Sequence, residues 1–130
     1  MSIDADGWLD DWDHVNLDSG LSWTGGPGKL ILHTGEGGQA LQGLINGFQR
    51  NPSIVSHAGV SWAERRRAQF VSLLHSAKSL RNLPGGVETN RDQVYQIEIC
   101  DTWTDTPSIP EDGLEYIGDC VADFCRSREY

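Results

Sequence analysis

Hydrophobic residues recur with the period of a helix in two stretches of the chain. In residues 39–50 the apolar positions fall at i, i+3, i+4 and i+7, which places them on one face of a helix. That face is formed by Leu41, Leu44, Ile45 and Phe48. A closing helix is expected after Pro110, which suits a first helical turn. Its apolar side is formed by Leu114, Ile117, Val121 and Phe124.

Shorter apolar runs predict strands. Residues 29–33 end in a glycine-rich stretch, so we expect a buried strand that opens into a loop and carries His33 at its C-terminal end. Residues 54–62 and 69–74 indicate two strands of a hairpin, joined by the basic turn 63–67.

A last strand is predicted at residues 94–100, after a loop at 83–90 that contains a proline and paired glycines. The period of two places Glu98 and Gln96 on one face of this strand. The other face is formed by Tyr95, Ile97 and Ile99. The order strand, helix, hairpin, strand, helix predicts an α/β fold with a mixed central β-sheet flanked by helices.

The chain of 130 residues falls within the usual range of one domain. We divide it into an acidic, irregular lead-in at residues 1–28 and a folded domain at residues 29–130. The charge of the lead-in is interpreted as a solvated surface and not as a site. It comes from Asp4, Asp6, Asp10, Asp11 and Asp13.

The net charge of −9 argues against nucleic acid as a partner, because nucleic-acid binders need clustered cations to displace counterions. No apolar run reaches the length that spans a bilayer, and the N-terminus lacks the pattern of a signal peptide. Three cysteines leave one unpaired, which is a poor disulfide framework and favours a reduced interior. We therefore expect neither nucleic acid nor a membrane as a partner.

Three segments of the chain carry a resemblance to a known family. They are residues 30–37, residues 56–57, and a long third segment that comprises residues 77–82 and 84–92 and leads into residues 96–99. In this order they resemble the superfamily of N-acetylmuramoyl-L-alanine amidases and peptidoglycan recognition proteins, particularly lysin amidases of actinobacterial phages. The first segment is similar to the family's strand that ends in a zinc-binding His followed by Thr-x-Glu-Gly. The third is the most specific, because so long a run before a strand with an in-line Glu is hard to match by accident.

The resemblance implies hydrolysis of the amide between the lactyl group of N-acetylmuramic acid and L-alanine in bacterial peptidoglycan. His33 would be the first zinc ligand, and zinc would lower the pKa of a bound water toward ~7. Glu98 would be the general base, which requires a partly buried setting because its unperturbed pKa is near ~4.3. The resemblance also places Thr34, His57 and Asn90 around the cleft.

Each of these side chains also has an ordinary structural interpretation. A single His at a strand end is usually a satisfied polar residue, and Glu98 taken alone is a solvent-facing strand residue or an ion-pair partner. For His57 the interpretation as a core histidine is favoured. The arginines of turn 63–67 are interpreted as solvated, with an anionic polymer as the alternative partner. Cys120 and Cys125 do not share a helix face well and are expected to pack.

The sequence departs from the family in its metal ligands. A catalytic zinc takes three protein ligands, and in the family the other two normally lie beyond the last-but-one helix. Residues 111–128 resemble the helix before that point, and no later His follows. We therefore expect residues 29–130 to be the N-terminal portion of the usual fold.

Two functions are consistent with this departure. The chain is either part of a zinc amidase of the phage lysin type, or a metal-free amidase-like domain reused to bind peptidoglycan or proteins of a phage particle. In the first case a missing C-terminal segment completes the site. The expected location is the host cytoplasm before lysis, or the phage particle.

Overall fold

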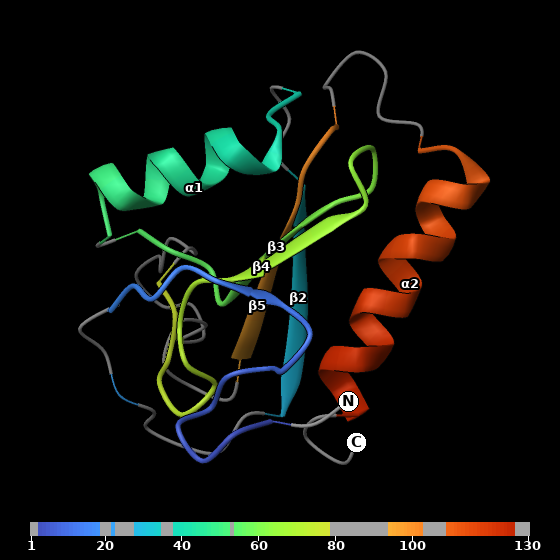
Figure 1. Ribbon diagram of the computed structural model, residues 1–130. Helices are drawn as coiled ribbons and strands as arrows, with labels where there is room; N and C mark the ends of the chain where they lie inside the picture. The colour runs from blue at the N-terminus through green and yellow to red at the C-terminus, as the bar shows by residue number, and fades with distance from the viewer. Residues whose placement is uncertain are drawn as a thin grey trace, which may run out of the picture.

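The computed structural model describes residues 3–18, 22, 28–34, 38–52, 54–78, 94–102 and 109–126. These residues form an α/β fold in which a mixed five-stranded sheet has the strand order β1-β4-β3-β5-β2. The elements are β1 (Asp13–His14), β2 (Lys29–Thr34), α1 (Leu41–Arg50), β3 (Ala58–Ser61), β4 (Arg66–Gln69), β5 (Val94–Ile99) and α2 (Glu111–Arg126). The two helices lie on opposite sides of the sheet (Figure 1).

The sheet combines a parallel core with an antiparallel hairpin. β2, β5 and β3 run parallel to one another, β4 runs antiparallel to β3, and β1 runs parallel to β4. The predicted order of strand, helix, hairpin, strand and helix is confirmed between residues 29 and 126. The predicted loop at 83–90 lies outside the described residues.

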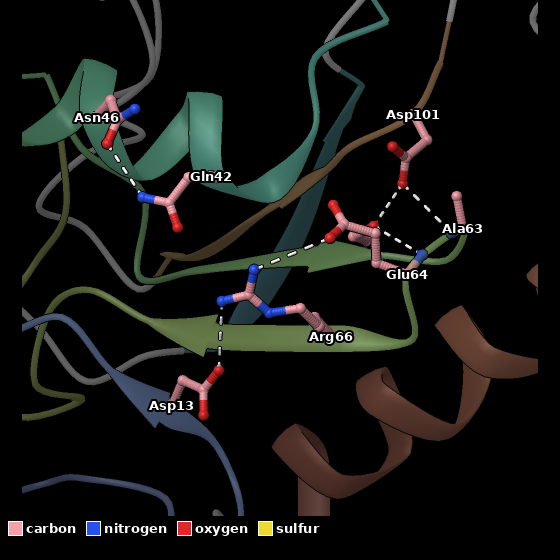
Figure 2. Close-up of polar contacts among 8 residues, drawn as sticks. Asp13, Gln42, Asn46, Ala63, Glu64, Arg66 and Asp101 are labelled. Atoms are coloured by element: carbon pink, nitrogen blue, oxygen red, sulfur yellow. Dashed lines mark hydrogen bonds and ion pairs between the residues drawn. The ribbon is translucent and has the colours of Figure 1, made fainter.

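The second strand of the hairpin both begins and ends earlier than the predicted range 69–74, so that Arg66 and Arg67 lie in β4 and not in the turn. Arg66 lies 3.7 Å from a carboxylate oxygen of Asp13 in β1, as Figure 2 shows, and Arg67 lies 2.6 Å from Asp123 in α2. The strand can contain these two arginines because each side chain reaches an oppositely charged partner on a neighbouring element. Apolar periodicity does not register such pairs, and the predicted boundary was wrong for this reason.

The turn between β3 and β4 is held by Asp101, two residues after the end of β5 (Figure 2). Asp101 Oδ2 accepts a hydrogen bond from Ser61 Oγ at 2.6 Å and one from the Ala63 backbone N–H at 3.3 Å. Ser61 Oγ in turn accepts a hydrogen bond from the backbone N–H of Glu64 at 3.2 Å. Asp101 has φ 61°, a left-handed conformation that Asp tolerates better than most residues.

α1 uses the apolar face that the sequence predicts. Leu41, Leu44 and Ile45 are buried, and the ring of Phe48 packs edge-on against Phe70 with centroids 5.2 Å apart. Gly59 of β3 lets the helix approach the sheet. A Cβ at this position would lie 2.8 Å from Leu44 Cδ2 and 3.0 Å from Phe70 Cε2, so a side chain there would displace these neighbours.

α2 uses most of its predicted face, because Ile117 and Phe124 are buried and Val121 packs against the same core. Leu114 is the exception. Leu114 is 54% exposed, and the buried positions of the helix are Gly113, Ile117, Cys120 and Phe124. A Cβ at Gly113 would lie 2.8 Å from Ile109 Cγ2 and 2.9 Å from Trp62 Cε3. The helix therefore places its smallest residue against the Trp62 ring, and Leu114, about 100° further round the helix, points to solvent.

The N-terminal segment is irregular over most of its length and packs against the sheet. Its five aspartates are exposed, in agreement with the prediction of solvated charge. Leu9 and Trp12 are buried in the core between α2 and the sheet, and residues 13–14 add the edge strand β1. None of the helices in the described parts of the chain is long and apolar enough to cross a membrane.

The two glycines of α2 provide a matched test of its packing. We expect Gly113→Ala to lower the free energy of unfolding by about 1–3 kcal/mol, because the new methyl group overpacks the contact with Trp62. Gly118→Ala meets no atom within 4 Å and should raise it by about 0.5–1 kcal/mol through helix propensity. Urea unfolding of the two variants measures both changes. Equal effects at the two positions would contradict the close packing of Gly113 against Trp62.

Candidate functional site

His33 and Glu98, which come from distant segments of the chain, lie side by side in the sheet. β2 and β5 are parallel, and His33 is the direct register partner of Glu98. On the other side of β5 the partner of Glu98 is Gly59 of β3. Register partners project to the same face of a sheet, so His33, Glu98 and Gly59 form one row on the face that α1 covers.

The surroundings of Glu98 hold its carboxyl group in a state unlike that of a surface glutamate. Burial raises the pKa of Glu98 to about 7. β5 is an inner strand of the sheet, and the neighbouring position Gly59 is packed by Leu44 and Leu41 of α1, whose apolar side chains exclude water. Near neutral pH the side chain therefore exchanges a proton readily, which is the property that a general acid or base needs.

His33 is held neutral beside this carboxyl group. Partial burial lowers the pKa of His33, and a hydrogen bond with the side chain of Gln96 opposes this effect. A hydrogen bond that favours the protonated ring is one in which a ring N–H donates to the amide oxygen of Gln96. A neutral imidazole has one acceptor nitrogen, which is the atom through which histidine binds a metal ion or a polar substrate group.

Gln96 is itself fixed by His57. The backbone N–H of Gln96 donates to Nδ1 of His57 at 3.1 Å, and the backbone N–H of His57 donates to the carbonyl of Gln96 at 2.9 Å. Because Nδ1 accepts, the proton of the neutral ring is on Nε2, which donates to the carbonyl of His75 at 2.8 Å. Burial lowers the pKa of His57 to about 4, so the ring stays neutral.

The structure brings together only some of the site residues that the resemblance implies. His33 and Glu98 are neighbours. Thr34 is exposed, and its register partner Ile99 belongs to the core on the α2 side, so Thr34 projects to the opposite face from His33. His57 is fully buried with both ring nitrogens bonded, which is the core-histidine interpretation. Asn90 lies outside the described residues.

Gln96 is the site residue that sequence reasoning missed. Strand alternation placed it on the same face as Glu98, and that was the available signal. Its full burial and its hydrogen bond to His33 depend on the pairing of β2 with β5. That pairing joins segments far apart in the sequence, and local periodicity does not report it.

Within the described residues, no group of three or more His, Cys, Asp or Glu side chains is placed to hold a metal ion. This part of the chain supplies one imidazole, His33, next to one carboxylate, Glu98. A catalytic zinc requires three protein ligands, so these residues do not by themselves make a zinc site.

Two other groups of candidate residues have structural roles. Arg65, Arg66 and Arg67 each form an ion pair with a carboxylate, so their charge is already compensated within the protein. Burial, reinforced by nearby carboxylates, raises the pKa of the Cys100 thiol to about 12. The thiol therefore stays protonated at neutral pH and is a poor nucleophile.

No protein-family model matches the chain, and no curated protein matches it. The α/β class rests on the sheet and helices described above. Functional inference accordingly rests on the side chains at the β2–β5 pair and on the segments that resemble the amidase superfamily.

The raised pKa of Glu98 makes a signed prediction for stability. A carboxyl group whose pKa is higher in the folded than in the unfolded protein stabilises the fold below about pH 4.5, and this contribution is lost as the pH rises through about 7. Glu98→Gln cannot ionise, so at pH 8 it should be more stable than the original protein by roughly 1–2 kcal/mol, allowing for partial solvent exposure. At pH 4 the two should differ little. Urea unfolding at both pH values, with the exposed Glu115→Gln as control, measures the difference.

The lowered pKa of His57 predicts the opposite trend. A neutral buried histidine contributes stability above pH 6.5 that is lost as the pH falls through about 4. This loss is worth up to about 3 kcal/mol, and it should be absent in His57→Gln. The measurement is the slope of unfolding free energy between pH 6.5 and 4, with His75→Gln as an exposed control. An unchanged slope in His57→Gln would show that another group carries the acid sensitivity.

Proposed function

We propose that this chain is an amidase-like domain of the phage lysin type, and that it acts in hydrolysis of the amide between N-acetylmuramic acid and L-alanine of bacterial peptidoglycan. One observation carries the proposal. His33 and Glu98, which the resemblance assigns as first zinc ligand and general base, are direct register partners on neighbouring strands. An accidental resemblance in two distant segments would have no reason to bring those two side chains together.

The properties of Glu98 suit the role of the base. With a pKa of about 7, its carboxylate accepts a proton from the water molecule that attacks the amide carbonyl. The resulting carboxylic acid then donates that proton to the nitrogen of L-alanine as the carbon–nitrogen bond breaks. The same residue thus returns to its starting state, and the products are the lactyl carboxylate and the free amine of the peptide.

The surroundings of the pair support this chemistry. Gln96 orients the imidazole of His33, and His57 fixes the strand position of Gln96. Side chains that are locked in this way hold a reacting group in place without rearrangement during the reaction. Within the proposal His33 would be one ligand of a zinc ion, which would polarise the carbonyl when bound.

The alternative function is a metal-free amidase-like domain that binds peptidoglycan or phage particle proteins. In either case the protein acts from the host cytoplasm at lysis or from the phage particle, and for the hydrolase the principal partner is peptidoglycan. The two functions differ in one product, the soluble stem peptide with a free L-alanine amine.

The proposal predicts different defects for the two site residues. His33→Ala should lose any bound zinc, measured by elemental analysis. Glu98→Gln should keep that zinc and lose about 10²–10⁴-fold in the rate of peptide release from purified cell wall. In the original protein kcat/KM should rise as the pH increases through about 7, because the base must be ionised.

Glu115→Gln, an exposed carboxylate of α2, is the matched control and should hydrolyse normally. Full peptide release by Glu98→Gln would overturn the role of Glu98. Sedimentation of the original protein with cell wall, without peptide release and without zinc, would support the binding domain instead.

A further inference from the structure

A second candidate site lies apart from His33 and Glu98. A cavity of about 320 Å³ opens between the N-terminal segment, the residues after β1 and the residues after β4. These segments lie side by side in Figure 1, the first in blue and the last in yellow. β4 runs antiparallel to β3, so the cavity lies at the end of the sheet where β3 and β5 begin. His33 and Glu98 lie in the C-terminal halves of their strands, toward the other end.

The walls of this cavity are tied together by backbone hydrogen bonds. The N–H of Leu73 donates to the carbonyl of Gly7 at 2.9 Å, and Ser72 Oγ donates to the carbonyl of Asp6. The N–H of Leu17 donates to the carbonyl of Phe70 at 2.8 Å. The cavity is therefore already formed, and a ligand would not need to order it on binding.

Gly7 is what allows the N-terminal wall to come so close. It has φ 88°, in the left-handed region, and a Cβ there would lie 2.3 Å from Ser72 Oγ. A residue with a side chain would both strain the backbone and push the two walls apart. Glycine at position 7 thus allows the N-terminal segment to lie close to residues 72–73.

The lining combines an aromatic surface with polar groups of several kinds. Trp8 is half-buried, and its ring packs at a tilt against His14 with centroids 5.1 Å apart. The polar groups around it belong to Asp6, Asn16, Asp18 and His75. Among the described residues neither lysine nor arginine lines the cavity, and the two carboxylates there disfavour phosphate and carboxylate ligands.

We propose that this cavity binds a neutral saccharide unit of a glycan, in the class of N-acetylated hexosamines. The apolar face of a sugar ring packs on an indole, and its hydroxyl and amide groups both donate and accept hydrogen bonds, as this lining requires. An alkylammonium ligand would use only the acceptors and leave the amide N–H groups of Asn16 unused. The volume is near the lower end of ordinary ligand sites, ~300–1,000 Å³, which suits one or two sugar rings.

The inference that the saccharide belongs to the glycan strand of the cell wall rests on the proposed function. The inference that the cavity binds a saccharide does not. A site at this end would hold the glycan away from the β2–β5 pair, so that binding and hydrolysis use separate residues. The two proposals can then fail independently of each other.

The test is titration of the full chain with N-acetylglucosamine and with its β-1,4-linked tetramer, followed by tryptophan fluorescence and by amide NMR shifts. We expect shifts at residues around the cavity and tighter binding of the tetramer. Trp8→Ala should weaken binding by about tenfold or more, whereas Glu98→Gln should leave it unchanged. Leu114→Ala, an exposed apolar residue on α2, is the control for a nonspecific surface effect.

Asn16→Ala provides a second variant at an exposed position, in case Trp8→Ala does not fold. It should weaken binding of the sugars and preserve the unfolding transition. The proposal is overturned if neither sugar shifts the cavity residues, if both variants bind as the original protein does, or if methylammonium binds there in preference to the sugars. Sugar binding with no peptide release would support this site and count against the proposed hydrolase.

Discussion

Two hydrogen bonds between His57 and Gln96 are the constraint on which the candidate site depends. The backbone N–H of His57 donates to the Gln96 carbonyl, and the backbone N–H of Gln96 donates to Nδ1 of the His57 ring. Both residues are fully buried, so each polar group that is not paired there would cost the free energy of its desolvation. A slip of β5 by one residue would break both bonds and turn Gln96 and Glu98 into the apolar core beneath α2. The bonds therefore fix which face of β5 carries its polar side chains, and with it the position of Glu98 beside His33.

The burial of Glu98, the proposed general base, lowers the stability of the fold when its carboxyl group is ionised. Glu98 carries its charge in surroundings that favour the neutral acid, since Gly59 admits the leucines of α1 next to it. An exposed glutamate would fold at lower cost, but its pKa would lie too low for efficient proton transfer near neutral pH. Residues that a fold tolerates at a cost in stability are often those that its function requires.

The sequence predicts the elements better than it predicts their partners. The apolar face of α1 and the alternation in β5 are local patterns, and burial of Leu41 and Ile97 confirms them. In α2 the buried Ile117 and Phe124 agree with the prediction, but Leu114 is exposed because Gly113 meets Trp62, a contact set by the β3–β4 turn. The Gln96 side chain escaped prediction for the same reason: its surroundings are created by strands that are distant in sequence. The resemblance gave His33 and Glu98 a role each, and their position side by side comes from the parallel pairing of β2 with β5.

The direction of the strands explains how one small sheet can carry two separate sites. In the parallel strands β2, β5 and β3, side chains near the carboxyl ends project into the crevice where α/β proteins usually bind ligands. β4 and β1 run the other way, so their carboxyl ends open at the opposite edge. The N-terminal segment closes that edge through Gly7, which requires its close contact with residues 72–73. The aspartates of this segment are exposed to solvent, but Asp6 also lines the cavity. The backbone contacts of the segment, and not its charge, place Asp6 there.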